Sequence, residues 1–92
     1  MEISMSTANQ LLLEALDSLK AGDLRTGPEW ERAHEICQAH EGEADFDWIH
    51  ALCHRIEGDD GNAGYWYRSA GRARNRGTIA EEWAAIRDAL AG

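Results

Sequence analysis

The sequence has few of the features that mark an exported or membrane protein. It contains only two cysteines, Cys37 and Cys53, and its longest unbroken apolar runs are a few residues, too short to cross a bilayer. Its first residues, Met1-Glu2-Ile3-Ser4, lack the basic flank and apolar core of a secretory signal. We therefore expect a cytoplasmic protein with reduced thiols and no membrane partner.

Positive charge is also scarce. Nine Lys and Arg stand against 17 Asp and Glu, which gives a net charge of -8 at pH 7. Such a chain repels nucleic acid and anionic lipid unless its few cations gather on one face. Nucleic acid is therefore not expected as a partner.

Residues that favour β-strands are few as well. Val is absent, and the apolar residues recur three or four positions apart and almost never two apart. A chain of 92 residues is long enough for one compact domain but not for two. The pattern predicts a single all-α domain over residues 1–92, made of five short helices.

Capping residues set the ends of the outer helices. The first helix is expected to start at Thr7, capped by Ser6 or Thr7, and to stop at Gly22. The segment from Thr78 to Glu81 is a capping box that opens the last helix. Both helices carry an apolar stripe at helical spacing, so each is expected to pack against the rest of the domain.

Three further helices are expected in the middle of the chain. Pro28 opens the second, which should reach Glu41, and Asp45 or Asp47 caps the third, which should end at Gly58. The third helix has both an apolar and a His-bearing face, so it should lie in the centre. The expected arrangement is two antiparallel hairpins and a C-terminal capping helix, at about 7–41, 45–74 and 79–91.

A tetratricopeptide-like pattern appears in the second hairpin. It consists of a small residue in the first helix, a Gly-Asp turn, and an Ala, aromatic, Ala series in the second: Ala51, Gly58-Asp59, Ala63, Tyr67 and Ala70. Residues 48–70 thus resemble a tetratricopeptide hairpin, and the preceding hairpin resembles a degenerate copy. The resemblance implies two TPR-like hairpins stacked on each other.

A longer run combines Trp, His and acidic positions. It reads Trp30-x-x-Ala33-His34, then Asp47-Trp48-Ile49-His50-Ala51-x-x-His54-Arg55-x-Glu57-Gly58-Asp59-x-x-Asn62-Ala63-x-Tyr65-Trp66-Tyr67-x-x-Ala70-Gly71, with Glu82-Trp83 near the end. This run is similar to that of a family of small bacterial proteins of unknown function. The resemblance implies a shared site but supplies no activity.

Three histidines suggest a site. His50 and His54 lie one helical turn apart, so both imidazoles can reach one metal ion, and His34 can add a third nitrogen from the second helix. Asp47 and Glu57 flank the pair. Two other interpretations stay open: the imidazoles are neutral, buried and hydrogen-bonded in the core, or one of them is a general base beside a carboxylate.

Other catalytic classes have no support. The chain lacks a Gly-x-Ser-x-Gly elbow, a phosphate loop and a dinucleotide-binding motif. Cys37 and Cys53 both lie on apolar stripes, where a thiol is usually a small hydrophobic residue. The sequence therefore gives no basis for acyl transfer through a nucleophilic serine or cysteine, or for nucleotide chemistry.

Charge is divided unevenly along the chain. Residues 29–60 contain ten acids and two Arg, whereas residues 61–80 contain four Arg and no acid. At helical spacing Tyr65 lies near Arg68 and Arg72, outside the inner face that carries Trp66. This group fits either a solvated face or a small-anion or partner site with an aromatic wall and cationic donors. The charge division favours pairing with an oppositely charged surface, including a homodimer, although an Arg run at a helix end also complements the helix dipole without any partner.

Together these features lead to two hypotheses. The first is a small interaction or ligand-binding module, without a cofactor, for a protein or small-molecule partner; its site comprises His34, His50, His54, Glu57, Trp66, Arg68 and Tyr65. The alternative is an enzyme that uses His50 and His54 as a general base or as ligands to Zn²⁺ or another divalent metal. In the metal version the ligand set is His50, His54, His34 and Asp47.

Overall fold

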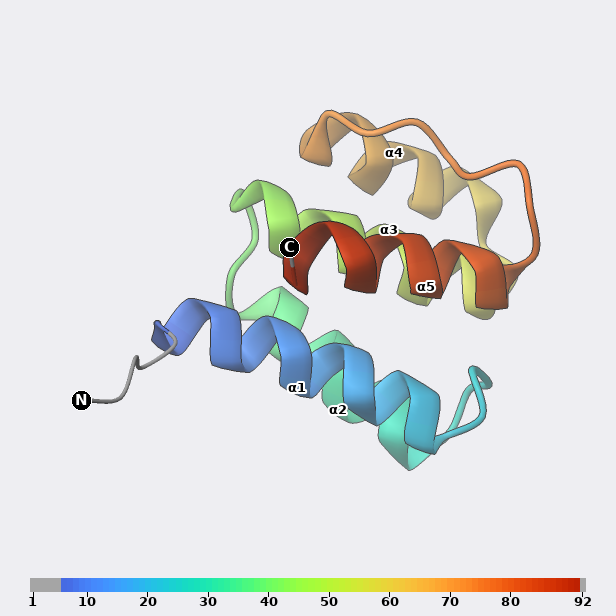
Figure 1. The fold of residues 1–92 in the computed structure, drawn as a ribbon. Coiled ribbons are helices and arrows are strands. Elements are labelled where there is room, and N and C mark those ends of the chain that lie inside the picture. The colour runs from blue at the N-terminus through green and yellow to red at the C-terminus, as the bar shows by residue number, and fades with distance from the viewer. Residues whose placement is uncertain (1–5, 92) are drawn as a thin grey trace.

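The computed structural model describes residues 6–91, which form five α-helices joined by short connections (Figure 1). No strand occurs in this part of the chain. The predicted all-α fold of five helices is therefore confirmed. The helices are α1 (Thr7–Ala21), α2 (Pro28–Gln38), α3 (Ala44–Ile56), α4 (Asp60–Ala70) and α5 (Ile79–Ala91).

Side-chain caps start three of the helices. The Ser6 hydroxyl accepts a hydrogen bond of 3.1 Å from a first-turn amide of α1, and the Asp59 carboxylate does the same for α4 at 3.1 Å. At α5, the Thr78 amide donates to the Glu81 carboxylate (2.8 Å) and the Glu81 amide donates to the Thr78 hydroxyl (3.0 Å). These bonds satisfy amides that have no partner inside the helix.

Two helix ends differ from the expectation. The second helix ends at Gln38 and not at Glu41. The fourth ends at Ala70 and not near residue 74, because Gly71 takes a left-handed conformation (φ 69°) that closes the helix. The segment after Gly71 is therefore a loop.

The predicted cap of α3 is also wrong. Neither Asp45 nor Asp47 is the cap; both lie in the first turn, and Glu43 occupies the cap position although its side chain makes no hydrogen bond to the amides of the helix. The Asp47 carboxylate instead accepts a hydrogen bond from the Gly42 amide at 3.1 Å. It thus holds the α2–α3 turn from inside the helix.

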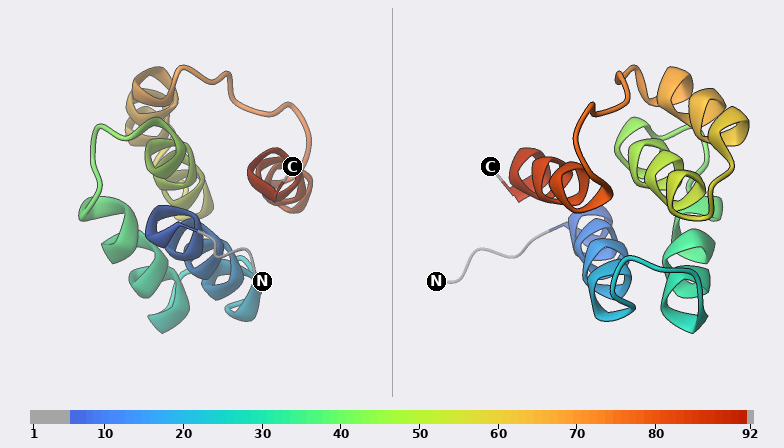
Figure 2. Two further views of the ribbon diagram at one scale, coloured as in Figure 1. Left: turned by 60° about the vertical axis from the view of Figure 1, so that its left-hand side comes forward. Right: turned by 90° about the vertical axis from the view of Figure 1, so that its right-hand side faces the viewer.

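Helix α3 is the centre of the molecule. α1 and α2 form one antiparallel hairpin, α3 and α4 form another, and α5 packs against both α1 and α3 (Figures 1 and 2). α3 contacts all four other helices, and every residue from Phe46 to His54 is buried. An α-helix can be buried all round only when neighbours cover each face, so the predicted central position of this helix is confirmed.

A buried polar network fixes α5 to the second hairpin. The Arg55 guanidinium of α3 contacts the Glu82 carboxylate of α5 at 2.6 Å, and their side chains are 10% and 1% exposed. The Tyr67 hydroxyl of α4 contacts both Glu82 oxygens, at 2.8 and 2.7 Å. Arg55 also donates to the carbonyl of Gly77 at 2.6 Å and so secures the loop before α5. Burial and the neighbouring carboxylate raise the pKa of Tyr67, which keeps its hydroxyl a donor.

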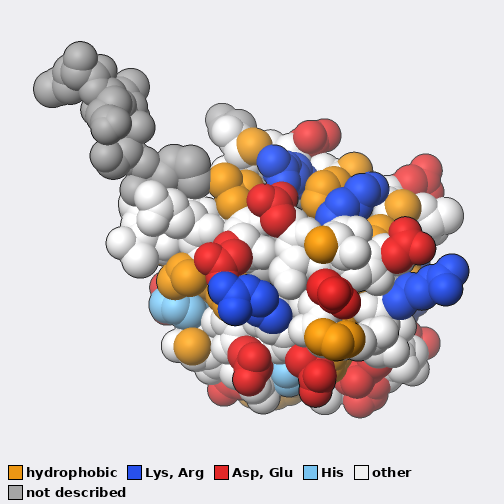
Figure 3. Space-filling model, turned by 90° about the horizontal axis from the view of Figure 1, so that it is seen from below, with side chains coloured by type: hydrophobic (Ala, Val, Ile, Leu, Met, Phe, Trp, Pro, Cys, Tyr) orange, Lys and Arg blue, Asp and Glu red, His pale blue; other side chains and the backbone are white. Residues whose placement is uncertain are grey.

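The described helices include none that is long and apolar enough to cross a membrane. Seen from the side of α1 and α2, the surface mixes acidic, basic and apolar side chains (Figure 3).

Candidate functional site

Three histidines meet where α2 packs against α3. His34 comes from α2, and His50 and His54 come from successive turns of α3. One ring nitrogen from each lies within 4.8 Å of the other two. The His50 and His34 Nε2 atoms are only 3.1 Å apart, so the N–H of one ring donates a hydrogen bond to the bare nitrogen of the other. We call these three residues the histidine cluster.

Trp30 holds His34 in place from one turn earlier on α2. The indole and imidazole planes are stacked, with centroids 4.8 Å apart and an angle of 9°. The Trp30 Nε1–H donates to the backbone carbonyl of Cys53 at 2.8 Å. Because that carbonyl belongs to α3, one indole both orients His34 and ties α2 to α3.

Trp66 covers the cluster from α4. Its ring stacks on His50 at a centroid distance of 4.0 Å and an angle of 14°. Tyr65 meets the edge of Trp66 at 4.9 Å but is itself 56% exposed. Tyr65 therefore borders the site through Trp66.

Burial keeps the imidazole of His50 neutral at pH 7. His50 is 2% and His54 6% exposed. Desolvation, followed by the neighbouring His34 and His54, lowers the pKa of His50 to about 3. Desolvation and His54 also lower the pKa of His34, against the opposing effect of Glu57 and other carboxylates. At neutral pH His34 and His50 thus offer uncharged nitrogens, the form that binds metal.

Glu57 is paired with His54. Its carboxylate lies 2.5 Å from His54 Nδ1, which leaves Nε2 as the free nitrogen of that ring. A second set of potential ligands comprises His54, Glu57 and Asp59, within 4.8 Å of one another. The Asp59 carboxylate, however, already caps α4. Glu57 therefore acts on the cluster through His54.

The cluster suits a tetrahedral ion. Zn–N bonds of 2.0–2.1 Å at tetrahedral angles place neighbouring ligand nitrogens about 3.4 Å apart. The nitrogens here span 3.1 Å to at most 4.8 Å, which brackets that spacing. The His50 and His54 rings are stacked at 24°, so at least one of them would have to rotate for both lone pairs to meet at one ion. A carboxylate on the second nitrogen of a ligating histidine is the usual partner in zinc sites, and Glu57 occupies that position.

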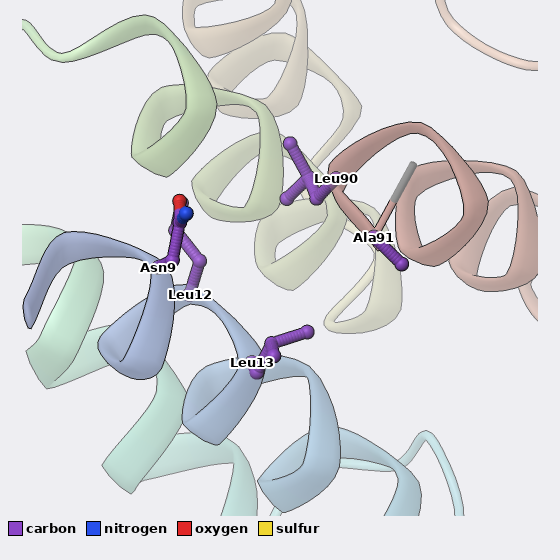
Figure 4. A pocket seen from close by; sticks show the side chains of 5 residues that line it. All are labelled: Asn9, Leu12, Leu13, Leu90 and Ala91. Carbon is purple, nitrogen blue, oxygen red and sulfur yellow. The ribbon is translucent and has the colours of Figure 1, made fainter. Parts of the chain in front are cut away.

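Two surface cavities lie away from the cluster. One of about 260 Å³ opens between the start of α1 and the end of α5, and one of about 310 Å³ lies against α1 and α2 (Figure 4 shows the first). No residue of the histidine cluster lines either of them. The three imidazole centroids lie 4.7 to 5.1 Å apart, so the space between the rings suits an ion.

The structure brings most of the predicted site residues together, but not Asp47 or Arg68. Asp47 is buried away from the cluster, where it accepts hydrogen bonds from the Gly42 amide and from the Ser69 hydroxyl, the latter at 2.6 Å. Arg68 is exposed and folds back along α4 beside Gly64. The residues that do come together are His34, His50, His54, Glu57, Trp66 and, at the edge, Tyr65.

Trp30 was missed as a site residue, although the sequence contained a signal for it. Its spacing of four from His34 places both rings on one face of the second helix. Its second contact, to the carbonyl of Cys53, depends on the packing of two helices. The sequence pattern does not encode that contact.

Fold and site together define a small all-α domain with a three-histidine cluster at the contact of its two hairpins. A scan against models of protein families, a search of curated proteins and a search of solved structures each found no match to the chain. The family resemblance inferred from the sequence stays a prediction.

Proposed function

We propose that this protein is a small helical metal-binding module that holds one divalent ion of the zinc class at His34, His50 and His54. The observation that carries the proposal is the convergence of three ring nitrogens within 4.8 Å of one another. The proposal identifies a metal ion as the molecule that the binding module expected from the sequence would hold. Of the four metal-coordinating residues expected from the sequence, it keeps all but Asp47.

The supporting geometry reaches beyond the nitrogens. Trp30 and Trp66 fix the rings by stacking, and Glu57 contacts the outer nitrogen of His54. A site whose ligands are held in place before binding loses less entropy when the ion arrives. The lowered pKa of His50 means that its ring need not release a proton on binding at neutral pH.

The competing explanation is that the cluster is simply packed core. A purely structural cluster should satisfy its buried polar atoms, because an unpaired one costs about 1–3 kcal/mol. His50 Nδ1 is buried without a hydrogen-bond partner among the described residues. An apolar ring at this position would leave no nitrogen unpaired, so packing alone does not account for the imidazole, whose other nitrogen, Nε2, faces His34.

Zinc titration tests the proposal. We expect the untagged protein, stripped with chelator, to bind one Zn²⁺ per chain in calorimetry. Removing a residue that hydrogen-bonds to a metal ligand weakens metal binding by ~10–100-fold, so replacing a ligand itself should weaken zinc binding by more than that. His50→Ala and the half-exposed His34→Gln are the test variants.

His40→Gln is the matched control. His40 is outside the cluster, where it stacks on Phe46 and pairs with Glu43. We expect this variant to bind zinc like the parent chain, with circular dichroism confirming the fold of each variant. Zinc binding that is absent from the parent, or equally strong in His34→Gln, would refute the metal site.

Removing the charge of Glu57 should have a smaller effect. Glu57→Gln keeps the size of the side chain but offers His54 Nδ1 only an amide, so the ligand becomes less basic and less firmly oriented. We expect a loss of ~10–100-fold in zinc affinity with stoichiometry unchanged. Calorimetry measures this, and an unchanged affinity would mean that the 2.5 Å contact does not support the metal ligand.

The expected hairpin type, location and oligomeric state are also proposals. We propose that α3 and α4 form a TPR-like hairpin, supported by the burial of Ala51, Ala63, Tyr67 and Ala70 and by the positive φ (83°) of Gly58 at the turn. A cytoplasmic location and a homodimer stay predictions. Free, buried Cys37 and Cys53 accord with the first.

A further inference from the structure

The described part of the chain offers the ion no fourth ligand. The only other group of potential ligands near the cluster shares His54 and adds Glu57 and Asp59. The first carboxylate is bonded to His54 and the second caps α4. Cys37 and Cys53 are fully buried and do not belong to the three-histidine group. Three protein ligands leave one position of a tetrahedral ion to an outside molecule.

Partly exposed side chains border one side of the cluster. His50 and His54 are buried, whereas His34 and Trp66 are partly exposed. The side chain of Glu57 is 31% exposed. The edge formed by His34, Trp66 and Glu57 is therefore the side from which we expect water to approach. A structural zinc site is closed by four protein ligands, and this one is not.

We propose that the fourth position is open, holds a water molecule, and makes the site a hydrolytic centre for neutral carboxylic esters. This inference rests on the proposed metal-binding function. Zinc held by three histidines lowers the pKa of its bound water to about 7, so the nucleophile forms at neutral pH without an activated side chain. This agrees with the absence of a serine or cysteine nucleophile motif from the sequence.

The reaction balances with water alone. The bound water loses one proton to solvent, and its oxygen forms a bond to the acyl carbon. The bond between that carbon and the ester oxygen then breaks. The acid passes the proton that remained on the added oxygen to solvent and leaves as a carboxylate. The alcoholate takes up one proton from solvent, so one proton is released per ester hydrolysed. The ion stabilises the negative charge that develops on the acyl oxygen.

Charge and shape define the substrate class. Glu57, Glu41 and Glu35 all act electrostatically on His34, and the whole chain carries -8. A dianionic phosphate ester is repelled by these carboxylates, whereas a neutral ester is not. The exposed ring of Tyr65 and the partly exposed Trp66 form an aromatic edge beside the open side, which favours an ester with an aromatic group.

Two measurements on the full chain test the inference. The first uses Co²⁺ in place of zinc and follows its visible absorption while azide is added. An open position predicts a spectral change as azide replaces water. The second follows hydrolysis of 4-nitrophenyl acetate and of 4-nitrophenyl phosphate by the zinc-loaded protein.

We expect the loaded protein to hydrolyse the acetate at least ~10-fold faster than the stripped protein, with a rate that rises as pH passes through about 7. The phosphate should not react above the zinc-free rate. His40→Gln should keep the full rate, and His34→Gln should lose it along with the ion.

The outcomes separate this inference from the metal site itself. If the ion binds one per chain but azide leaves the cobalt spectrum unchanged, the position is closed and the inference is wrong. A spectral change without faster hydrolysis of the acetate overturns the activity. Equal hydrolysis of acetate and phosphate overturns the substrate class. Only a failure to bind any ion also overturns the proposed function.

Discussion

Replacing Glu82 with Gln is expected to destabilise the domain by about 3–5 kcal/mol, the cost of leaving one partner of a buried ion pair charged and alone. Glu82 is 1% exposed and Arg55 retains its charge in the variant. The Tyr67 hydroxyl also loses a carboxylate acceptor. For a domain of this size the change should lower the melting temperature by roughly 12 °C or more, measured by circular dichroism.

Two companion variants show that the pair is responsible. Asp88→Asn removes an acid from the exposed face of the same helix, and we expect its stability to stay within about 0.5 kcal/mol of the parent. Replacing both Arg55 and Glu82 with Met should recover much of the loss, because an apolar pair of similar volume needs no compensating charge. A Glu82→Gln variant as stable as Asp88→Asn would show that the network contributes little.

This network also shows where prediction from sequence stopped. Glu82 follows Ile79 by three positions and precedes Ile86 by four, so the helical repeat places it inside the buried stripe. That spacing signalled a buried acid. Its partner Arg55 lies 27 residues earlier and was visible only as a cation in an acidic segment. Pairing across helices depends on the packing angle, which the repeat does not specify.

The helices themselves were predictable because their signals are local. Ser6 and the Thr78 capping box are confirmed at the starts of α1 and α5, since a cap needs only residues within one turn. Asp47 misled the cap prediction for the opposite reason. A carboxylate near a helix start can also accept bonds from the preceding turn and from another helix, and Asp47 does both.

The candidate site was partly predictable for the same reason. His50 and His54 share a face because they are four residues apart on one helix, and the sequence indicates this directly. His34 can join them only if α2 packs on α3 at one particular position. The sequence offered this as a hypothesis, and the 3.1 Å distance between the His34 and His50 Nε2 atoms supports it. Arg68 was misplaced because Trp66, two residues earlier, points to a different side of α4.

Acidification is expected to destabilise the metal-free protein. The pKa of His50 falls from 6.5 to about 3 on folding. Below pH 6.5 the unfolded chain therefore takes up a proton that the folded chain does not, so stability decreases as pH falls. At 1.36 kcal/mol per unit, His50 alone accounts for about 2 kcal/mol between pH 7.5 and pH 5, and the lowered pKa of His34 acts in the same direction.

Urea unfolding across this pH range, with chelator present, measures the loss. Asp and Glu in the unfolded chain stay largely ionised above pH 5, so histidines dominate the change in proton uptake. His50→Phe keeps a ring against Trp66 but cannot titrate, and it should flatten the dependence by about the 2 kcal/mol assigned to His50. A parent protein equally stable at pH 7.5 and 5 would mean that His50 is charged or solvated in the fold, which removes the neutral imidazole that the metal site requires.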